Sequence, residues 1–217
     1  MIHQGELFSA TPLDTLKFER SAYSDGFTCV AGIDEAGRGP LAGPVMAAAV
    51  ILPAGLTIIG VDDSKKLTPD KREKIYEIIM AQATSVGVGI VSPVEIDRIN
   101  ILQATRRAML AAVQQLSPHP DYLLIDGISA IDSTIPQKTI KKGDSLSLSI
   151  AAASIIAKVT RDRLMIEMDT AYPGYGFAGH KGYGSAAHLD AIRRLGPSPI
   201  HRLTFGGVKE HVDCTSS

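Results

Sequence analysis

The sequence predicts an α/β fold, because short apolar segments typical of strands alternate with longer segments that carry apolar residues at helical spacing. Turns that contain Gly or Pro separate several of these segments. Strands are expected at residues 29–34, 45–52, 57–61, 85–91 and 122–127. Helices are expected at residues 69–83, 101–116, 145–168 and 185–195, with a short one that opens at 92–95.

Local signals mark where several helices begin. Thr68 precedes Pro69, which is the usual order of an N-cap residue and a first helical residue. The segment at residues 92–95 reads Ser-Pro-Val-Glu and matches a capping box. Residues 145–168 are rich in Ala, Ile and Leu and contain neither Gly nor Pro, so a largely buried helix is predicted there.

We expect one main domain preceded by an N-terminal extension. Residues 1–27 are polar and mixed, with Leu13, Leu16 and Phe18 spaced as on one short amphipathic helix, and we place them outside the main fold. Residues 28–217 form the domain, and its C-terminal part, about residues 185–217, is expected to be helical.

The composition excludes several classes of protein. With 217 residues, 45% of them hydrophobic and 21% charged, the chain is not expected to be disordered. No apolar run reaches the roughly 20 residues of a membrane helix, and the two cysteines are typical of a reducing compartment, so a cytoplasmic protein is expected. The net charge is −1, yet residues 138–209 carry eleven basic and five acidic side chains. Both a phosphate-binding surface and a solvated helix face fit that excess.

Acidic residues stand at the ends of two predicted apolar strands. Asp34 and Glu35 end one strand and Asp126 ends another, while Asp144 comes just before the long predicted helix. Carboxylates that converge at buried strand ends repel one another, and a divalent cation reverses that repulsion. Oxygen ligands without a His or Cys set favour Mg²⁺ or Mn²⁺ over zinc. Taken singly, each of these residues also fits an aspartate or glutamate in an ordinary turn.

The first predicted strand is followed by a loop rich in Gly and Pro at residues 37–44. This loop is not a dinucleotide-binding fingerprint, because its glycine spacing differs and an apolar strand rather than a helix follows it. Its glycines let backbone groups approach a ligand closely beside Asp34 and Glu35, and Arg38 can contact a phosphate. A plain tight turn is the alternative.

Clusters of cations beside polar or acidic residues are candidate phosphate contacts. Lys65 and Lys66 belong to one cluster, and Lys158 belongs to another. We expect these three lysines to bind the substrate, with solvated surface as the alternative for each.

Tyrosines and histidines are concentrated near the C-terminal third of the chain. Tyr183 lies among His, Lys and Gly residues, a setting that suits stacking on a base or sugar, whereas Tyr175 is expected to pack internally. His180, His188 and His201 are too widely spaced to define a metal site, and we leave them unassigned.

Several blocks of the sequence together point to one family. The most specific block is Ala31-Gly32-Ile33-Asp34-Glu35-Ala36-Gly37-Arg38-Gly39-Pro40-Leu41-Ala42-Gly43-Pro44-Val45. The others, in chain order, are Asp63-Ser64-Lys65-Lys66-Leu67, Ile125-Asp126-Gly127, Lys142-Gly143-Asp144, the stretch from Ala152 to Asp162, and His180-Lys181-Gly182-Tyr183. In content and order these blocks resemble ribonuclease HII, the type 2 bacterial ribonuclease H, over about residues 28–207. Residues 128–134 match no part of the pattern.

The resemblance implies a ribonuclease H-like fold, in which helices flank a mixed five-stranded sheet and the C-terminal part is helical. It implies that the metal-binding and catalytic residues are Asp34, Glu35, Asp126 and Asp144. It further implies that residues 37–39, Gly-Arg-Gly, read the 2′-OH of a ribonucleotide. Tyr183 is implied to stack under the deoxyribose of the next nucleotide.

The implied activity is hydrolysis of the RNA strand of RNA/DNA hybrids and nicking of duplex DNA on the 5′ side of an embedded ribonucleotide, with two divalent ions. One alternative is a metal-dependent DNA nuclease of the same superfamily, which would keep the carboxylates but have no use for a 2′-OH sensor. Another is a non-enzymatic nucleic-acid-binding module, which would need the glycines and cations but not four acids. A membrane partner is not expected.

A short segment near the start of the chain suggests a protein partner. Residues 4–8 read Gln-Gly-Glu-Leu-Phe, a pattern that resembles the peptides by which repair and replication proteins bind the bacterial sliding clamp. An ordinary terminus whose Leu7 and Phe8 pack onto the domain is the alternative.

Overall fold

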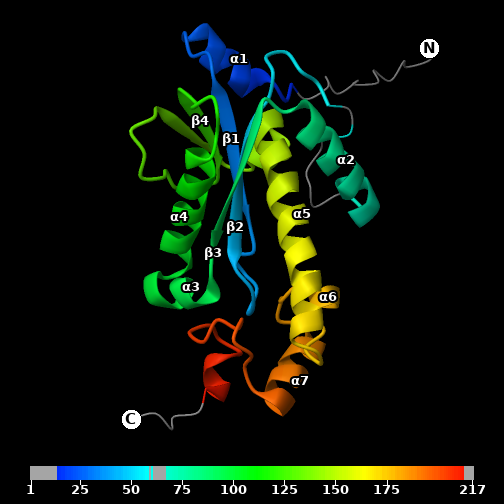
Figure 1. Ribbon diagram of the computed structural model, residues 1–217. Coiled ribbons are helices and arrows are strands. Elements are labelled where there is room, and N and C mark those ends of the chain that lie inside the picture. Colours follow the sequence, from blue (N-terminus) through cyan, green and yellow to red (C-terminus); the bar gives the residue numbers. More distant parts are fainter. Residues whose placement is uncertain (1–13, 59, 61–66, 213–217) are drawn as a thin grey trace, which may run out of the picture.

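A mixed five-stranded sheet forms the centre of the molecule in the computed structural model, which describes residues 14–58, 60 and 67–212 (Figure 1). The strands are β1 (Val30–Ala36), β2 (Val45–Ile51), β3 (Ser85–Val91), β4 (Tyr122–Asp126) and β5 (Gln137–Ile140). They lie in the order β3-β2-β1-β4-β5. β1 runs antiparallel to β2 and parallel to β4, which confirms the expected mixed sheet.

Helices cover both faces of this sheet (Figure 1). α4 (Ile101–Gln114) packs on one face, and α5 (Leu148–Ala171), with α2 (Pro69–Gln82) beside it, packs on the other. β2 is therefore buried along its whole length and reads as a continuous apolar run, as expected for a strand covered on both sides.

Missing side chains bring the helices unusually close to the sheet. A Cβ at Gly32 of β1 would lie 2.1 Å from the backbone carbon of Ser149 in α5, and one at Gly89 of β3 would lie 1.9 Å from the carbonyl oxygen of Ala108 in α4. Any side chain at either position would therefore push a helix away from the sheet. Because α5 lies so close to β1, its residues stand directly beside the end of the central strand.

The predicted helix starts are confirmed where a capping residue precedes them. The side chain of Thr68 accepts a hydrogen bond from Lys71 N at the start of α2, and Ser92 accepts one from Glu95 N at the start of α3 (Pro93–Ile99). Ser185 does the same for α7 (Ala186–Leu195).

Two predicted elements differ from the structure, and one strand was not predicted. The strand expected at residues 57–61 is absent among its described residues, because Ile58 is buried in the core without a neighbouring strand to pair with. β5 was not predicted, because its polar, half-exposed residues lack an apolar pattern. The long helix begins at Leu148 rather than at Ser145, because residues 143–145 form a separate 3₁₀ turn and Ser147 is the N-cap.

Helix α1 (Lys17–Ser24) packs onto the domain through a buried carboxylate. Glu19 is 5% exposed, and its Oε1 accepts hydrogen bonds from Ser149 N at 3.0 Å, Ser149 Oγ at 2.7 Å and Ser147 Oγ at 2.6 Å. The boundary placed after residue 27 stays a prediction, but residues 14–27 contact the start of α5 through these bonds.

The C-terminal part combines short helices with irregular segments. It contains α6 (Phe177–His180), α7 and a 3₁₀ turn at Lys209–His211, which lie at the far end of α5 (Figure 1). In the described part of the chain, no helix is long and apolar enough to span a bilayer.

Replacing Glu19 tests how firmly α1 belongs to the fold. Glu19→Ala is expected to lower the free energy of unfolding by about 2–4 kcal/mol, because it removes a buried acceptor that three donors share. Urea unfolding measures the change. Arg20→Ala on the same helix is the control, since Arg20 forms an exposed ion pair with Asp14 whose loss should change stability by less than about 0.5 kcal/mol. Equal small effects would show that α1 is dispensable.

Candidate active site

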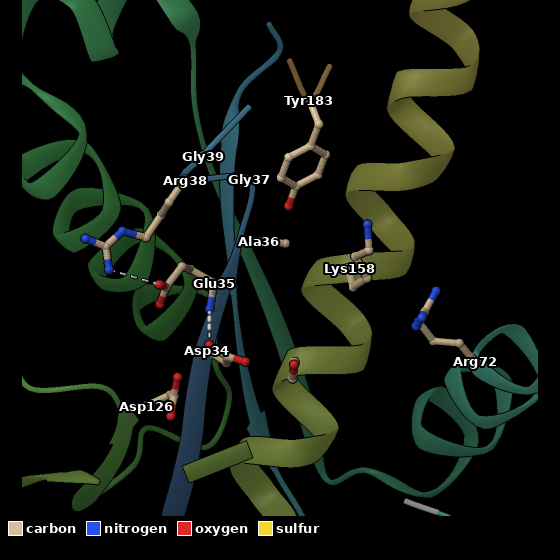
Figure 2. A pocket seen from close by; sticks show the side chains of 11 residues that line it. Asp34, Glu35, Ala36, Gly37, Arg38, Gly39, Arg72, Asp126, Lys158 and Tyr183 are labelled. Atoms are coloured by element: carbon tan, nitrogen blue, oxygen red, sulfur yellow. Dashed lines mark hydrogen bonds and ion pairs between the residues drawn. The ribbon is translucent and has the colours of Figure 1, made fainter. Parts of the chain in front are cut away.

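A cavity of about 250 Å³ opens where β1 ends (Figure 2). The ends of β1 and β4, the loop after β1, and helices α2 and α5 contribute its walls. The lining residues are Asp34, Glu35, Ala36, Gly37, Arg38, Gly39, Arg72, Asp126, Ser154, Lys158 and Tyr183. Most of the described residues that the sequence marked as functional therefore share one cavity.

Three carboxylates meet at one end of the sheet, because the parallel strands β1 and β4 both finish there. Ile33 pairs with Ile125, so Asp34 and Asp126 follow at neighbouring positions on β1 and β4. Backbone donors hold two of these carboxylates in place. Glu35 N donates to Asp34 Oδ1 at 2.7 Å, and Gly143 N donates to Asp126 Oδ1 at 2.6 Å.

Asp34 is the most deeply buried of the three. Burial raises the pKa of Asp34 well above its usual value, and the nearby charges of Glu35 and Asp126 raise it further. The hydrogen bonds from Ser154 and from Glu35 N lower the pKa, but they do not offset the burial. The ionised form of Asp34 is therefore unfavourable without a compensating positive charge, and a divalent cation supplies such a charge.

The donor set fits a hard divalent ion. The acidic groups that line the cavity offer only oxygen atoms, and no His or Cys lines it. Within the described residues, no three Asp, Glu, His or Cys side chains already stand as a complete metal-ligand set. Mg²⁺ is usually held by only one or two carboxylates, with water and substrate phosphate as the other ligands, so a partial set suits it better than a structural zinc.

Asp144 adjoins the cavity instead of lining it. It is 4% exposed and belongs to the 3₁₀ turn Gly143–Ser145, next to the glycine whose N–H binds Asp126. It does not cap α5, since the N-cap is Ser147. Asp144 is thus held near Asp126 by the hydrogen bond that the preceding residue, Gly143, donates to Asp126.

The loop after β1 has a shape that requires glycine. Gly37 has a φ of +92°, and a Cβ there would lie 2.1 Å from Arg161 Nε and 2.9 Å from Pro44 O. Arg38 is exposed and its Nη1 lies 3.3 Å from Glu35 Oε1. Gly39 leaves its backbone open toward the cavity, with the Tyr183 ring nearby (Figure 2).

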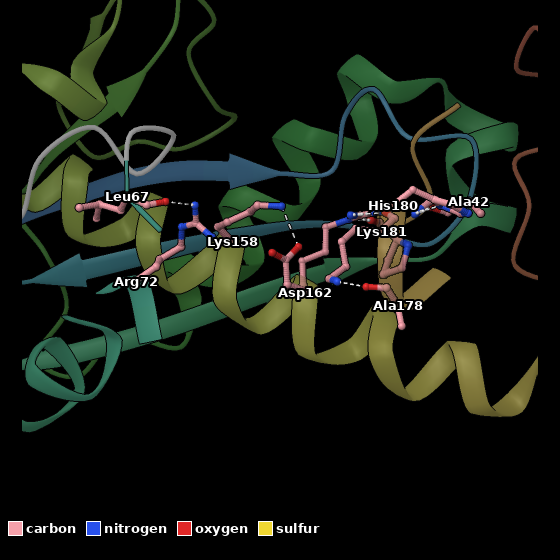
Figure 3. Close-up of polar contacts among 11 residues, drawn as sticks. Ala42, Leu67, Arg72, Lys158, Asp162, Ala178, His180 and Lys181 are labelled. Carbon is pink, nitrogen blue, oxygen red and sulfur yellow. Dashed lines mark hydrogen bonds and ion pairs between the residues drawn. The ribbon is translucent and has the colours of Figure 1, made fainter. Parts of the chain in front are cut away.

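Tyr183 and two cations face the carboxylates across the cavity (Figure 2). The Tyr183 side chain is 46% exposed, and Lys158 Nζ lies 6.0 Å from the centre of its ring. Lys158 also bonds to Asp162 Oδ1 at 2.7 Å, and Arg72 bonds to the carbonyl oxygen of Leu67 at 2.9 Å (Figure 3). Lys65 and Lys66 lie outside the described residues.

The three unassigned histidines form a contiguous group that sequence spacing does not reveal. The rings of His180 and His188 stack with their centres 4.2 Å apart, and His188 Nε2 lies 3.0 Å from His201 Nε2. Burial lowers the pKa of His188, and burial together with His188 lowers the pKa of His201 to about 4. The lowered pKa values favour the neutral forms of His188 and His201 at pH 7. His188 Nδ1 lies 2.9 Å from Tyr183 O, at hydrogen-bonding distance. Tyr175 packs in the core against Phe177, as expected.

Sequence reasoning did not single out four residues at or behind the site. Ser154 and Arg161 lie inside the matched block from Ala152 to Asp162, which was a usable signal. Arg72 on α2 and Arg202 near the C-terminal end of the fold stand in no matched block. Only the folded chain shows where those two lie.

Carboxylates at the ends of neighbouring strands, beside an exposed aromatic ring and basic side chains, define a metal-dependent nuclease of the ribonuclease H-like fold. The family model named Ribonuclease HII matches residues 31–208. The chain belongs to the ribonuclease HII family, whose members are metal-dependent endonucleases.

Similar proteins agree with this assignment. The chain is 67% identical over 216 residues to Ribonuclease HII of Pelobacter propionicus, covering 100% of this chain and 99% of that protein. It is 65% identical over 195 residues to Ribonuclease HII of Geobacter sulfurreducens, covering 90% of each. The crystal structure of ribonuclease H2 from Pyrococcus horikoshii matches with a TM-score of 0.71 and 29% identity, over 84% of this chain and 96% of that one. A PCNA:RNase HII complex from Archaeoglobus fulgidus matches with a TM-score of 0.72 and 26% identity, over 82% and 96%.

The burial of Asp34 predicts a specific dependence of stability on pH. Because its pKa is raised in the folded state, the folded protein binds a proton more tightly than the unfolded chain does. Without metal, stability should therefore fall as pH rises from about 4, the pKa of an unfolded aspartate, through the raised value. Asp34→Asn removes this loss, so in EDTA the variant should be more stable than the wild type at pH 7 and lose that advantage near pH 4.

Urea unfolding across this pH range, with and without Mg²⁺, measures the effect. Asp132→Asn is the control, since Asp132 is exposed and its replacement should change the pH dependence little. A wild type as stable as Asp34→Asn at pH 7 in EDTA would show that the buried charge is compensated by the protein itself.

Proposed function

We propose that this chain hydrolyses the RNA strand of RNA/DNA hybrids and cuts duplex DNA on the 5′ side of an embedded ribonucleotide, leaving 3′-OH and 5′-phosphate ends. One observation carries the proposal, namely that the carboxylates share a cavity with the glycine-flanked Arg38 and with the exposed ring of Tyr183. Groups suited to hydrolysis thus lie beside groups suited to recognising a sugar. A DNA nuclease would have no use for a sensor of the ribose 2′-OH.

We assign the metal-binding role to Asp34, Glu35 and Asp126, with Asp144 alongside, and the ions to Mg²⁺ or Mn²⁺. Two such ions, when bound, would activate water for attack and stabilise the leaving 3′ oxygen. The protein's part is to hold oxygen atoms ready for them. The N–H groups of Glu35 and Gly143 fix the orientation of Asp34 and Asp126, so little rearrangement is needed on binding.

We assign substrate recognition to the opposite side of the cavity. Backbone N–H groups of residues 37–39 would donate to a ribose 2′-OH, a group that DNA lacks. Arg38 is exposed and available to a phosphate, and Tyr183 offers a ring face for the neighbouring sugar. Lys158 adds a positive charge beside that ring, and Lys65 and Lys66 are proposed to contact the flanking phosphates.

Cleavage of three duplexes that differ only in their sugars tests the proposal. In Mg²⁺ the wild type should cleave an RNA/DNA hybrid and a DNA duplex with one ribonucleotide, and leave an all-DNA duplex intact. Asp126→Asn should lower kcat on the first two by at least about 100-fold, because a charged ligand is lost where phosphate charge must be neutralised. Asp132→Asn, in an exposed loop, is the matched control and should cleave normally.

The other possible results separate the alternatives. Cleavage of the all-DNA duplex at a comparable rate would identify a DNA nuclease. Tight binding of all three duplexes without Mg²⁺-dependent cleavage would identify a binding module.

We also propose that the chain acts in the cytoplasm on newly copied DNA and binds the sliding clamp through residues 4–8, which lie outside the described residues. The similar Archaeoglobus fulgidus protein is in complex with PCNA, which supports a clamp partner. The Gln-x-x-Leu-Phe pattern offers two apolar side chains for a hydrophobic pocket and an amide to orient them. Such tethering would raise the local enzyme concentration without changing the chemistry.

Deletion of residues 1–9 tests the clamp proposal. The truncated protein should cleave a short free duplex as fast as the full chain but bind the clamp much more weakly in a direct binding assay. Glu6→Ala is the control, because Glu6 is a variable position of the pattern and its replacement should leave clamp binding intact. If the full chain also fails to bind at tens of micromolar protein, the proposal is wrong.

A further inference from the structure

We propose that Arg202 is a positioning residue for ribonucleotide recognition, which it serves without touching the substrate. Its guanidinium fixes the peptide groups of residues 37–39 so that their N–H groups face the cavity. The inference rests on the proposed role of this loop in reading the 2′-OH.

Arg202 is completely buried, and its guanidinium donates to three backbone oxygens while it lies 5.0 Å from the centre of the Phe205 ring. Nη2 donates to Gly37 O at 2.5 Å, Nη1 donates to Arg38 O at 2.8 Å, and Nε donates to Gly43 O at 3.0 Å. The planar guanidinium presents these donors in a rigid fork, so the three carbonyl groups are held in one fixed arrangement.

Those contacts determine where the neighbouring N–H groups point. In a trans peptide the C=O of one residue and the N–H of the next point in opposite directions. With the carbonyls of Gly37 and Arg38 turned inward to Arg202, the N–H groups of Arg38 and Gly39 are turned outward. Both residues line the cavity, and no backbone oxygen in the described part of the chain accepts a hydrogen bond from either N–H.

The charge on Arg202 strengthens these donors. A cation bound to the oxygen of a peptide group polarises it and makes the adjoining N–H a better donor. Burial, and to a smaller extent the charge of Arg161, lower the pKa of Arg202 to about 9, so the guanidinium remains mostly charged at pH 7. A neutral side chain in its place would supply neither the fork nor the polarisation.

The backbone around Arg202 is itself anchored on both sides. Arg202 N donates to Leu41 O at 2.8 Å, and Leu41 N donates to Gly182 O at 2.8 Å, next to Tyr183. Asp97 on α3 accepts hydrogen bonds from the backbone N–H groups of the two residues that follow Arg202. These hydrogen bonds fix the position of the Arg202 backbone behind the loop. The bond from Leu41 N to Gly182 O also joins the loop to the segment that contains Tyr183.

Binding of two duplexes that differ by a single 2′-OH tests the inference. Dissociation constants are measured with Ca²⁺ in place of Mg²⁺ for a DNA duplex with one ribonucleotide and for its all-DNA equivalent. Arg202→Lys keeps the charge but not the fork, and Arg202→Met removes both. In both variants the preference for the ribonucleotide should fall about three- to tenfold, the loss expected for one hydrogen bond, while binding of the all-DNA duplex changes less than about twofold.

A control separates this role from a general loss of stability. Val113→Ala removes core volume on α4, away from the cavity, and should lower the melting temperature while leaving the preference unchanged. The ratio of two dissociation constants is insensitive to the fraction of folded protein, so it isolates recognition.

The outcomes distinguish a failure of the proposed 2′-OH reading from a failure of the role of Arg202 alone. If the wild type shows no preference for the ribonucleotide, the proposed reading of the 2′-OH is wrong and the inference is wrong with it. If the wild type shows the preference and both Arg202 variants keep it, only the role of Arg202 is overturned.

A measurement on the wild type keeps the inference testable should both variants fail to fold. The amide NMR resonances of Arg38 and Gly39 are expected to shift more with the ribonucleotide duplex than with the all-DNA duplex. Equal shifts with the two duplexes would overturn the inference.

Discussion

Burial of a carboxylate at the end of the central strand is the constraint on which the rest of the structure depends. Asp34 can be buried only because α5 lies directly against β1, and α5 can lie there only because Gly32 has no side chain. The parallel pairing of β1 with β4 then places Asp126, at the end of β4, beside Asp34. The fold thus brings three carboxylates together where one of them is buried, an arrangement that a divalent cation would stabilise.

The two halves of the site are built by different means. The carboxylates stand on regular strands, where the hydrogen-bonded sheet sets their spacing. The side proposed for recognition stands on irregular segments, where buried arginines supply hydrogen bonds that a sheet would otherwise provide. Arg161 donates to the carbonyls of Ala42, Pro44 and Lys181. Arg202 donates to those of Gly37, Arg38 and Gly43 in the loop after β1. The conformation of the loop after β1 therefore depends on two buried, charged arginine side chains.

Sequence patterns predicted what depends on neighbours in the chain. Apolar runs predicted four of the five strands, and capping residues such as Thr68 and Ser92 predicted where helices begin. β5 was not predicted, because an edge strand with polar, half-exposed residues has no apolar periodicity. The strand expected at 57–61 is absent among its described residues, because a strand needs a pairing partner that no local pattern reveals. The carboxylates were found because strand ends are where sites form in α/β sheets.

The histidine group and the role of Arg202 were beyond such reasoning, for a physical reason. Their contacts join segments far apart in the sequence, and a scattered His or a lone Arg carries no periodic signal. His188 and His201, which contact each other in the folded chain, are separated by a helix C-terminus and a turn. Only the resemblance to a family placed Tyr183 near the carboxylates before the structure did.

The distance along the chain between Gly37 and Arg202 has a consequence for biosynthesis. The bond between them spans 165 residues, so the loop that follows the first strand acquires its final shape only after the C-terminal segment has left the ribosome. A partly synthesised chain, or a fragment cut short before Arg202, would carry the aspartates of the sheet but an unshaped loop. Nucleic acid bound by such a fragment would meet these charges without the loop that we propose distinguishes RNA from DNA.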